Sequence, residues 1–336
     1  MAYFGHRVQW RHATLLILGC FCGSVLFSAR PRRDVIQLNV VKKPDKNLNP
    51  MELKRRLLLS QKKIRSMPED RSQRHTEQEP IIVHFFLLLS TYKPSMGVSF
   101  LECISLRSVL KNLRPNRTLI HTNVPEFWPF ANCAGIIQNW SSVEIVPARR
   151  KFVMQGRRFV YLAHEADVMK LEALIKYGGL ALDFDVYIIN GRKVRDLMRT
   201  FPCFMCDEDD VPDRLNAGFV GCKRGSRFPK LMLQRSYRDD FRPDLWLWNS
   251  GQMSFILAAE EPSLVQIVPD VCNISIPERA NVLTRRDRYS WQDKIAYHTF
   301  YHDRLFTKSS LRKMNSSFGD LLKWILSNET RILGGS

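Results

Sequence analysis

The sequence lacks the motifs of nucleic-acid-binding proteins, although its net charge alone would suit one. Its 51 Lys and Arg residues outnumber 33 Asp and Glu residues, which gives a formal charge of +18. Neither a zinc-finger spacing nor an aromatic motif of an RNA-binding domain accompanies this charge. The excess is uneven, because residues 30–76 hold 14 basic and five acidic residues. A basic segment beside an apolar run is typical of contact with lipid head groups or of solvation, so we expect no nucleic acid among the partners.

Charged residues are absent from residues 13–29, and acidic residues are absent from the whole of 1–29. The run ATLLILGCFCGSVLFSA has 17 residues, the lower limit for crossing a bilayer. Arginines flank it on both sides, so charge asymmetry does not fix its orientation. A cleaved signal peptide is the alternative, because Ala29 is small, although Phe27 fits a cleavage site poorly. The sequence predicts a cytoplasmic tail (1–12) and an uncleaved transmembrane signal anchor (13–29).

Residues 30–79 lack sustained apolar periodicity and contain several prolines. Only Met51–Ile64 in this segment favours a short helix. Such a composition predicts a basic stem that holds a domain away from the membrane. From Ile81 onward the sequence becomes apolar, so residues 80–336 are the predicted folded domain.

Glycosylation sequons and cysteines both predict that this domain lies in the lumen of the secretory pathway. Five sequons occur, all within the domain, and they begin at Asn116, Asn139, Asn273, Asn315 and Asn328. Six of the eight cysteines follow the apolar run, an even number suited to disulfides, and these are Cys103, Cys133, Cys203, Cys206, Cys222 and Cys272. We therefore expect a single-pass type II protein of the Golgi membrane; the sequence gives neither its oligomeric state nor its disulfide pairing.

The spacing of Cys203 and Cys206 also matches a redox pair or half of a zinc site. The chain offers no second Cys or His pair at finger spacing. Structural cysteines are the favoured interpretation.

Strand-like and helix-like segments alternate along the domain. Ile81–Ser90 is a near-continuous apolar run, as expected for a strand covered on both faces. The segments after it predict a helix and two strands, over Phe100–Asn112, Thr118–His121 and Val143–Val146. This alternation predicts an α/β fold whose nucleotide-binding half spans about 81–190.

Two aspartates follow the next predicted strand. Residues 164–177 have apolar residues at helical spacing, and Gly178 is placed to end that helix. Leu180–Leu182 then predicts a short buried strand, with Asp183 and Asp185 at its carboxyl end. The two-residue period of a strand sends both carboxylates to one side and Phe184 to the core.

Two carboxylates on one side of a strand end can hold a divalent ion. Hard oxygen ligands suit Mg²⁺ or Mn²⁺, which keep positions open for phosphate oxygens. Such an ion would neutralise a departing diphosphate. The acidic run Asp207-Glu208-Asp209-Asp210 contains the same Asp-x-Asp pattern. It lies in a polar stretch before Pro212, which favours a solvated acidic loop.

The segment from His164 to Asp185 resembles the sugar-binding region, with its DXD motif, of glycosyltransferase family 32. The shared pattern is an acid and a base on a helix, then Tyr-Gly-Gly, a short hydrophobic step and Asp-x-Asp. The family includes α-1,4-galactosyltransferases, α-1,4-N-acetylglucosaminyltransferases and fungal α-1,6-mannosyltransferases. A thinner resemblance extends from Ile81 to His298. It implies a GT-A fold, a nucleotide-sugar donor (a UDP-sugar, or GDP-mannose as the alternative), Mn²⁺ or Mg²⁺, and retention of anomeric configuration.

The resemblance also implies site residues. Donor contacts would come from His164, Asp167, Lys170, Tyr177, Gly178, Gly179 and Asn216. Asn249 would join the two aspartates in catalysis, and His298 would complete the metal site. Trp246 and Trp248 could stack on acceptor sugars. Several of these residues also have a purely structural interpretation. Asp167 and Lys170 could form a surface ion pair, and Asn216 could be a turn residue. Trp246 and Trp248 could be core aromatics, and His298 could be a buried structural histidine.

Two positions depart from the family pattern. Lys170 stands where the family usually has Arg, and Ala181 replaces an aromatic residue. The sequence predicts a retaining transferase of a hexose or N-acetylhexosamine, with galactose or N-acetylglucosamine favoured and a glycan or glycolipid as acceptor. The departures leave an inactive sugar-binding protein as the alternative. A metal-dependent phosphohydrolase is less favoured, because the further His and Asn ligands of such enzymes cannot be assembled.

Overall fold

A computed structural model describes residues 49–65, 79–90, 97–126, 128–208, 211–269, 276–286 and 289–327. All of them belong to one compact unit of the chain. The predicted anchor (13–29) and most of the predicted stem lie outside the described residues, so both stay predictions. Within the described ranges, every helix is too short or too polar to cross a membrane.

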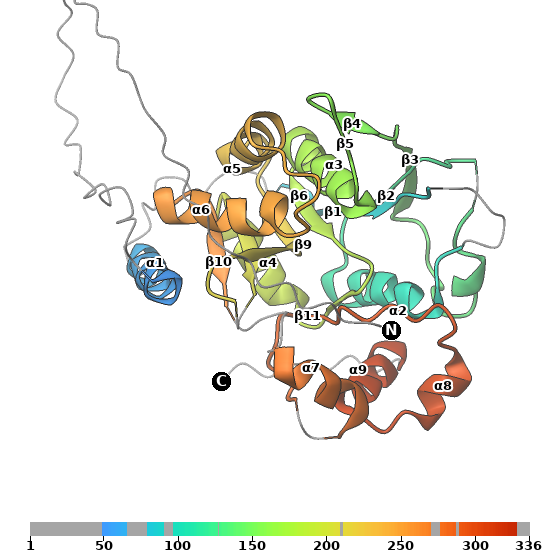
Figure 1. Cartoon of the computed structure of the whole chain (residues 1–336). Helices are drawn as coiled ribbons and strands as arrows, with labels where there is room; N and C mark the ends of the chain where they lie inside the picture. The colour runs from blue at the N-terminus through green and yellow to red at the C-terminus, as the bar shows by residue number, and fades with distance from the viewer. Residues whose placement is uncertain are drawn as a thin grey trace, which may run out of the picture. The chain divides into compact units, whose positions relative to one another are not determined.

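A seven-stranded mixed sheet forms the centre of the domain (Figure 1). The strand order is β10-β8-β9-β6-β1-β2-β3, and β9 runs antiparallel to both of its neighbours while the other pairs are parallel. The predicted α/β class is therefore confirmed. The strands are β1 (Ile82–Leu87), β2 (Arg117–Thr122), β3 (Val143–Pro147), β6 (Gly179–Leu182), β8 (Cys203–Asp207), β9 (Leu215–Cys222) and β10 (Gln266–Val268).

Alternating side chains of the strands supply two separate cores. Leu180 and Leu182 of β6 pack into the core that includes residues of α2 and α4, whereas Ala181 packs into the core of α3, α5 and α6. This is the two-residue period expected of a strand that is covered on both faces. The helices are α2 (Phe100–Ser108), α3 (Leu162–Tyr177), α4 (Gly191–Thr200), α5 (Arg227–Met232) and α6 (Met253–Glu260).

A third core joins α2 to the C-terminal helices, which lie beside α2 in Figure 1. The short antiparallel pair β7 (Val186–Ile188) and β11 (Ala296–His298) carries Tyr187 and Tyr297 into it, where both contact Phe318. Around this core lie α7 (Ile276–Thr284), α8 (Lys308–Lys313) and α9 (Ser317–Leu326). This pairing matters for the site, because β7 directly follows the Asp-x-Asp motif.

Each segment that the sequence predicted as a helix or strand lies within a few residues of an observed element, and these correspond to α1, β1, α2, β2, β3, α3 and β6. Helix α2 begins where Ser99 and Glu102 form a capping box. The predicted helix over 100–112 continues past α2 as a π-helical turn, Val109–Leu113, and ends at Arg114 in the left-handed conformation. Helix α3 starts two residues before the predicted residue 164.

The cysteines are structural, as favoured from the sequence. Cys103 is bonded to Cys133, and Cys203 is bonded to Cys222. Cys206 is also in a disulfide. The Cys203–Cys206 spacing is therefore not a redox or zinc pair.

Two histidines form a buried pair on the neighbouring strands β1 and β2. His84 of β1 lies 3.0 Å from His121 of β2 through Nδ1 and Nε2, and its own Nε2 lies 2.9 Å from the carbonyl oxygen of Gly178. A carbonyl only accepts, so Nε2 of His84 carries the proton and Nδ1 accepts from His121. Burial lowers the pKa of His84 to about 4 and that of His121 to about 3. Both rings are therefore neutral near pH 7.

This pair predicts a loss of stability in mild acid. Both folded-state pKa values lie below the unfolded value of about 6.5, so the unfolded chain binds more protons as the pH falls. The stabilisation is complete above about pH 6.5. Between about pH 7.5 and pH 5, each histidine should cost about 2 kcal/mol in the free energy of unfolding.

Urea unfolding at the two pH values measures this loss. The double variant His84→Gln, His121→Gln should be less stable at pH 7.5 but should lose less stability on acidification. An equal loss in the variant and the parent would contradict the assignment.

Candidate active site

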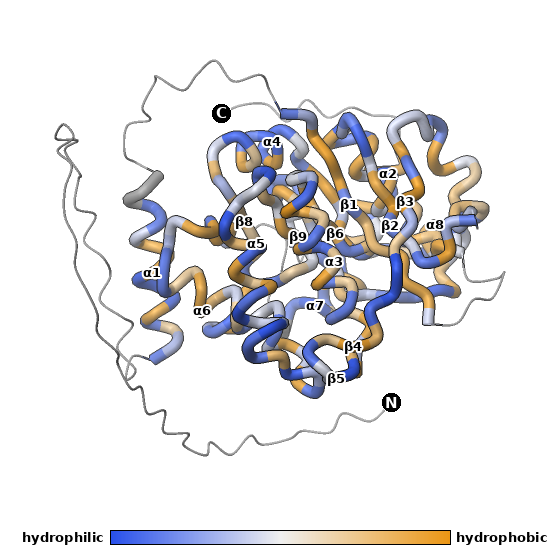
Figure 2. Tube along the Cα trace, turned by 90° about the horizontal axis from the view of Figure 1, so that it is seen from above, coloured by the Kyte–Doolittle hydropathy of each residue, from blue (hydrophilic) through white to orange (hydrophobic). Residues whose placement is uncertain are grey.

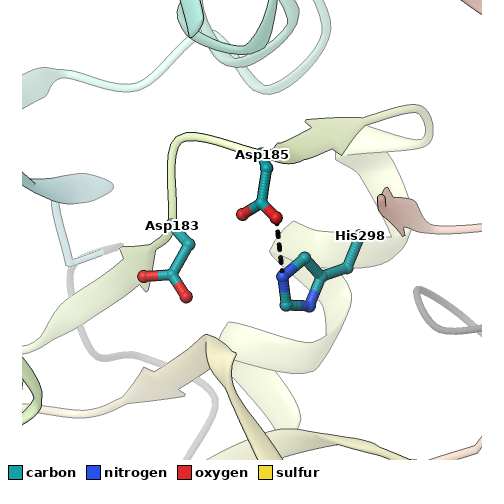
Figure 3. A group of neighbouring side chains, drawn as sticks. All are labelled: Asp183, Asp185 and His298. Carbon is teal, nitrogen blue, oxygen red and sulfur yellow. Dashed lines mark ion pairs between the residues drawn. The ribbon is translucent and has the colours of Figure 1, made fainter. Parts of the chain in front are cut away.

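The two aspartates lie in a tight turn between β6 and β7 (Figure 3). The backbone N–H of Asp183 donates to Gly218 of β9 (2.9 Å), and that of Val186 donates to Asp183 (3.1 Å). Phe184 is buried and stacks on Phe85 at 4.6 Å, as predicted. The carboxylates converge as expected, although through a turn rather than through continued strand periodicity.

His298 completes a cluster with the two aspartates (Figure 3). It is the last residue of β11, where strand pairing places it opposite Val186. Its Nε2 lies 3.2 Å from Oδ2 of Asp185, and both side chains are almost fully buried. One ligand atom from each of the three residues lies within 4.8 Å of the others. Two carboxylates and one imidazole are a suitable donor set for a divalent cation.

Glycine at position 218 keeps the space between these ligands open. A Cβ atom there would lie 2.6 Å from Cε1 of His298, 3.0 Å from Oδ2 of Asp183 and 2.9 Å from Oδ1 of Asn216. Nδ1 of His298 is buried and has no hydrogen-bond partner among the described residues. The cluster thus fits a metal ion in both its chemistry and its open centre.

The charges of the cluster are coupled. Burial alone would raise the pKa of Asp185, but His298 and, more weakly, His302 outweigh it and hold that pKa below its ordinary value. Burial likewise opposes the charge of His298, and Asp185 raises the pKa of this histidine above its usual value. His302 was not predicted; it lies 3.4 Å from Asp185 and is largely exposed. A cation at this position therefore competes with a proton on His298.

Lys170 holds the other aspartate. Its Nζ lies 2.6 Å from Oδ1 of Asp183 and 3.0 Å from Oδ1 of Asp167, and it donates to the carbonyl oxygen of Ala217 at 3.2 Å. Lys170 is fully buried, and the two carboxylates raise its pKa despite that burial. The alternative of an ordinary surface ion pair is therefore wrong. Oδ2 of Asp183 remains directed toward the metal cluster.

The glycines before β6 have a backbone reason to be there. Gly178 and Gly179 both have positive φ, 69° and 100°. A Cβ at Gly179 would lie 2.2 Å from the carbonyl oxygen of Ile82 in β1. Tyr177 ends α3 and packs near His84. These contacts position β6 and the turn after it; donor binding by these residues stays a prediction.

A second group of predicted residues lies apart from the metal cluster, near the start of α3. His164 is buried, with Nε2 2.9 Å from the carbonyl oxygen of Trp246. The Asn249 side chain is also buried and exchanges two hydrogen bonds with the backbone of Arg242. Both residues thus hold a loop, and the described contacts do not bring Asn249 to the aspartates. Trp246 is half exposed, while Trp248 lies under the guanidinium of Arg242 at 3.6 Å.

The acidic run that begins at Asp207, the last residue of β8, is not the solvated loop that the sequence favoured. Asp207 and Glu208 are both buried. Nζ of Lys54 lies 2.7 Å from Oδ1 of Asp207 and donates to the backbone oxygens of Glu208 and Val211. Lys54 belongs to α1 (Pro50–Arg65), so this helix of the predicted stem is part of the domain. Asp209 and Asp210 lie outside the described residues.

Glu208 links this ion pair to the metal cluster. Its carboxylate accepts from Asn216 (3.1 Å) and pairs with Arg279 (3.1 Å). The side-chain oxygen of Asn216 then accepts from the backbone of Gly218 at 2.8 Å. Arg279 stacks on Phe300, which in turn stacks on the ring of His298; each separation is 3.8 Å. The pair of Glu208 and Arg279 was not predictable from local patterns, because the two residues are 71 positions apart along the chain.

A cavity of about 180 Å³ is lined in part by Phe184 and Asp185. It lies between the start of α2, the Asp-x-Asp turn and the segment after β11. Its polar lining includes Ser99, Glu102, Asp185, His302, Asp303 and Arg304.

Comparisons with known proteins give distant similarities. No protein-family model matches the chain. Glucan organizing enzyme 1 of Cryptococcus neoformans var. grubii is 26% identical over 174 residues, which are 50% of this chain and 45% of that protein. The chain thus matches less than half of that relative's length. The resemblance to glycosyltransferase family 32 stays a prediction.

Solved glycosyltransferases are among the structural neighbours. The galactosyltransferase LgtC, in complex with donor and acceptor sugar analogs, has a TM-score of 0.42 and 10% identity, over 75% of this chain and 97% of LgtC. The glycosyltransferase GlyE of Streptococcus pneumoniae TIGR4 has a TM-score of 0.41 and 9% identity, over 76% of this chain and 62% of GlyE. At such TM-scores the likeness is distant.

The open centre at Gly218 predicts the effect of one added methyl group. Gly218→Ala should reduce Mn²⁺ affinity at least tenfold, because Cβ would occupy the space between the ligands. Manganese electron paramagnetic resonance measures the affinity. Gly221→Ala on the same strand is the control, since its Cβ would meet the Phe204 ring instead. That variant should lose stability but keep its Mn²⁺ affinity; equal affinity in both variants would refute the site.

The buried pair of Lys54 and Asp207 predicts that α1 stabilises the domain. Lys54→Met should lower the free energy of unfolding by about 3 kcal/mol, because it leaves a buried carboxylate without its partner. Adding Asp207→Asn should recover part of this loss. Arg56→Met, at an exposed pair with Glu52 in the same helix, should cost less than about 1 kcal/mol. Urea unfolding of the parent and the three variants measures these free energies. Equal losses of stability in Lys54→Met and Arg56→Met would contradict docking of α1.

Proposed function

We propose that this chain is a metal-dependent glycosyltransferase of the GT-A type, which transfers a hexose or N-acetylhexosamine from a nucleotide sugar. The observation that carries the proposal is the cluster of Asp183, Asp185 and His298. It lies at the carboxyl end of β6, and ligands of open α/β sheets bind outside the carboxyl ends of the strands. The cavity beside Asp185 would hold part of the donor.

In this function the three clustered residues hold the ion, and Mn²⁺ suits the mixed oxygen and nitrogen donors. When bound, the ion supplies positive charge that stabilises the departing diphosphate. Lys170 fixes Asp183 and leaves its second oxygen directed toward the cluster. His302 and Arg304 line the cavity, where their side chains can bind donor phosphates.

The two departures from the family pattern are compatible with activity. The side chain of Ala181 packs in the core between β6 and α3, so an aromatic ring there would meet the core rather than the donor. Lys170 keeps a positive charge at the position of the usual arginine and forms ion pairs with both Asp167 and Asp183. We favour a UDP-sugar of galactose or N-acetylglucosamine, with retention of configuration and a glycan or glycolipid acceptor.

The proposed location is the lumen of the Golgi, with residues 13–29 as a type II anchor. Support comes from the five sequons in the domain and from the disulfides Cys103–Cys133 and Cys203–Cys222. Disulfides persist in the oxidising compartments of the secretory pathway.

Removal of the two carboxylates tests the proposal. The double variant Asp183→Ala, Asp185→Ala should lose Mn²⁺-dependent hydrolysis or transfer of UDP-sugars by at least a hundredfold, because the ion loses two of its three protein ligands. Asp196→Ala on α4 is the control, since this aspartate is exposed and its ion pair within the described ranges is with Arg199 of the same helix. Product release across UDP- and GDP-sugars is the measurement.

Three results would redirect the assignment. Unchanged turnover in the double variant would remove the metal site from the mechanism. UDP binding by the parent protein without turnover on any donor would favour the inactive sugar-binding alternative. Release of inorganic phosphate from simple esters would favour a phosphohydrolase.

A further inference from the structure

Exposed apolar side chains gather around the hairpin of β4 (Val153–Met154) and β5 (Arg157–Arg158). Ten large apolar side chains are exposed in the described part of the chain, and six of them come from two short segments: Phe152, Val153, Val160, Leu162, Leu245 and Trp246. Tyr161 packs edge-to-face on Trp246 at 4.8 Å and joins the two segments. We call these six residues the hairpin face. Such clustering marks an interaction site more often than scattered exposure does.

Positive charge accompanies these apolar side chains. The segment from residue 149 to 162 holds five basic residues and no acid. Arg150 is neutralised by Glu165 and Lys151 by Glu172. The other three basic side chains are exposed and have no acidic partner within the described ranges: Arg149, Arg157 and Arg158. Figure 2 shows hydrophilic and hydrophobic stretches side by side along this hairpin.

The hairpin is held in place from its inner side. Gln155 and Gly156 form its turn with φ of 49° and 74°, the left-handed values of a tight two-residue connection. Phe159 packs on Phe241 at 5.0 Å, and the guanidinium of Arg157 donates to the Phe241 carbonyl oxygen at 2.6 Å. The fold itself therefore directs the exposed apolar side chains outward.

We propose that the hairpin face docks on the surface of a phospholipid bilayer. Its valines, Phe152 and Trp246 would enter the head-group region, where aromatic side chains are favoured. The guanidinium of Arg157 is held by the carbonyl oxygen of Phe241. The two other exposed arginines without an acidic partner in the described ranges, Arg149 and Arg158, would bind lipid phosphates. A soluble acidic polymer would use the arginines but would leave the exposed apolar side chains in water. A bilayer uses both.

The position of this face also names a class of acceptor, a step that rests on the proposed function. Leu162 of the hairpin face begins α3, and Lys170 in the same helix contacts Asp183. Eight residues of α-helix separate them by about 12 Å. His164 and Asp167 lie between the two. The hairpin face thus lies within the length of a short glycan from the metal cluster, and a lipid-linked glycan is the acceptor class that a bilayer docked on this face would favour.

The docking step is tested without turnover, in the full chain reconstituted in phosphatidylcholine vesicles. A solvatochromic fluorescent amino acid replaces Gln155 at the hairpin tip or, in the control, Ser309 of α8, which lies on the other side of the sheet (Figure 1). We expect a blue shift and quenching by nitroxide-labelled lipid at position 155 only. Equal exposure to water at both positions would overturn the proposal. So would a blue shift at 155 that rises with the protein-to-lipid ratio and is not quenched by nitroxide-labelled lipid, because it would indicate a second copy of the chain.

Two negative charges introduced among the apolar side chains of the hairpin face test the consequence for the substrate. Val153→Asp with Val160→Asp should abolish quenching at position 155 and lower kcat/KM on a lipid-linked glycan about tenfold, with a soluble glycan unaffected. Leu59→Asp is the matched control, an equally exposed leucine on α1. An unchanged lipid-linked reaction in the double variant would refute the acceptor class. If no acceptor turns over in any protein, the proposed function fails while the fluorescence result still decides the docking.

Discussion

A buried carboxylate needs a positive partner, and that requirement determines how this domain is built around Asp185. Its carboxylate is almost fully buried, so its charge is tolerable only beside His298. Strand β11 must therefore pair with β7 and bring the histidine to the turn. The same requirement recurs nearby, where three further carboxylates form ion pairs: Asp183 with Lys170, Glu208 with Arg279, and Asp207 with Lys54. Through these pairs, α1, α3 and α7 each contact a residue at the carboxyl end of β6 or β8.

Local sequence signals sufficed for β1, β2, β3 and β6 and for the aspartates that follow β6, but not for the later strands β7 to β11. Apolar runs such as Ile81–Ser90 predict buried strands, and the helix, glycines and short strand before Asp183 are contiguous in sequence. The burial of Asp207 and Glu208 was not predictable in this way, because a run of acids is ordinarily solvated. Their partners Lys54 and Arg279 come from remote segments of the chain. His302 escaped for a related reason: only the conformation after β11 brings it near Asp185.

The structure also separates two kinds of residue that the family pattern groups together. Asp183, Asp185 and His298 share one centre, with Lys170 and Asn216 next to it. Others hold the backbone in place: the paired glycines admit β6 beside β1, and Asn249 fastens a loop. A motif records both kinds equally, because both are required. Only contacts distinguish the residues that act on a ligand from those that support the chain.

Docking of α1 against the domain has a consequence for reach. If residues 13–29 anchor the chain, the tether runs only from residue 30 to residue 49, where α1 is about to begin. Even fully extended, those residues span no more than about 70 Å. The domain then explores a thin layer above its own membrane, where the effective concentration of lipids in that membrane is high and that of soluble molecules is not raised. The short length of the segment between the anchor and α1, rather than a contact of the domain, would then favour substrates in the same membrane over soluble ones.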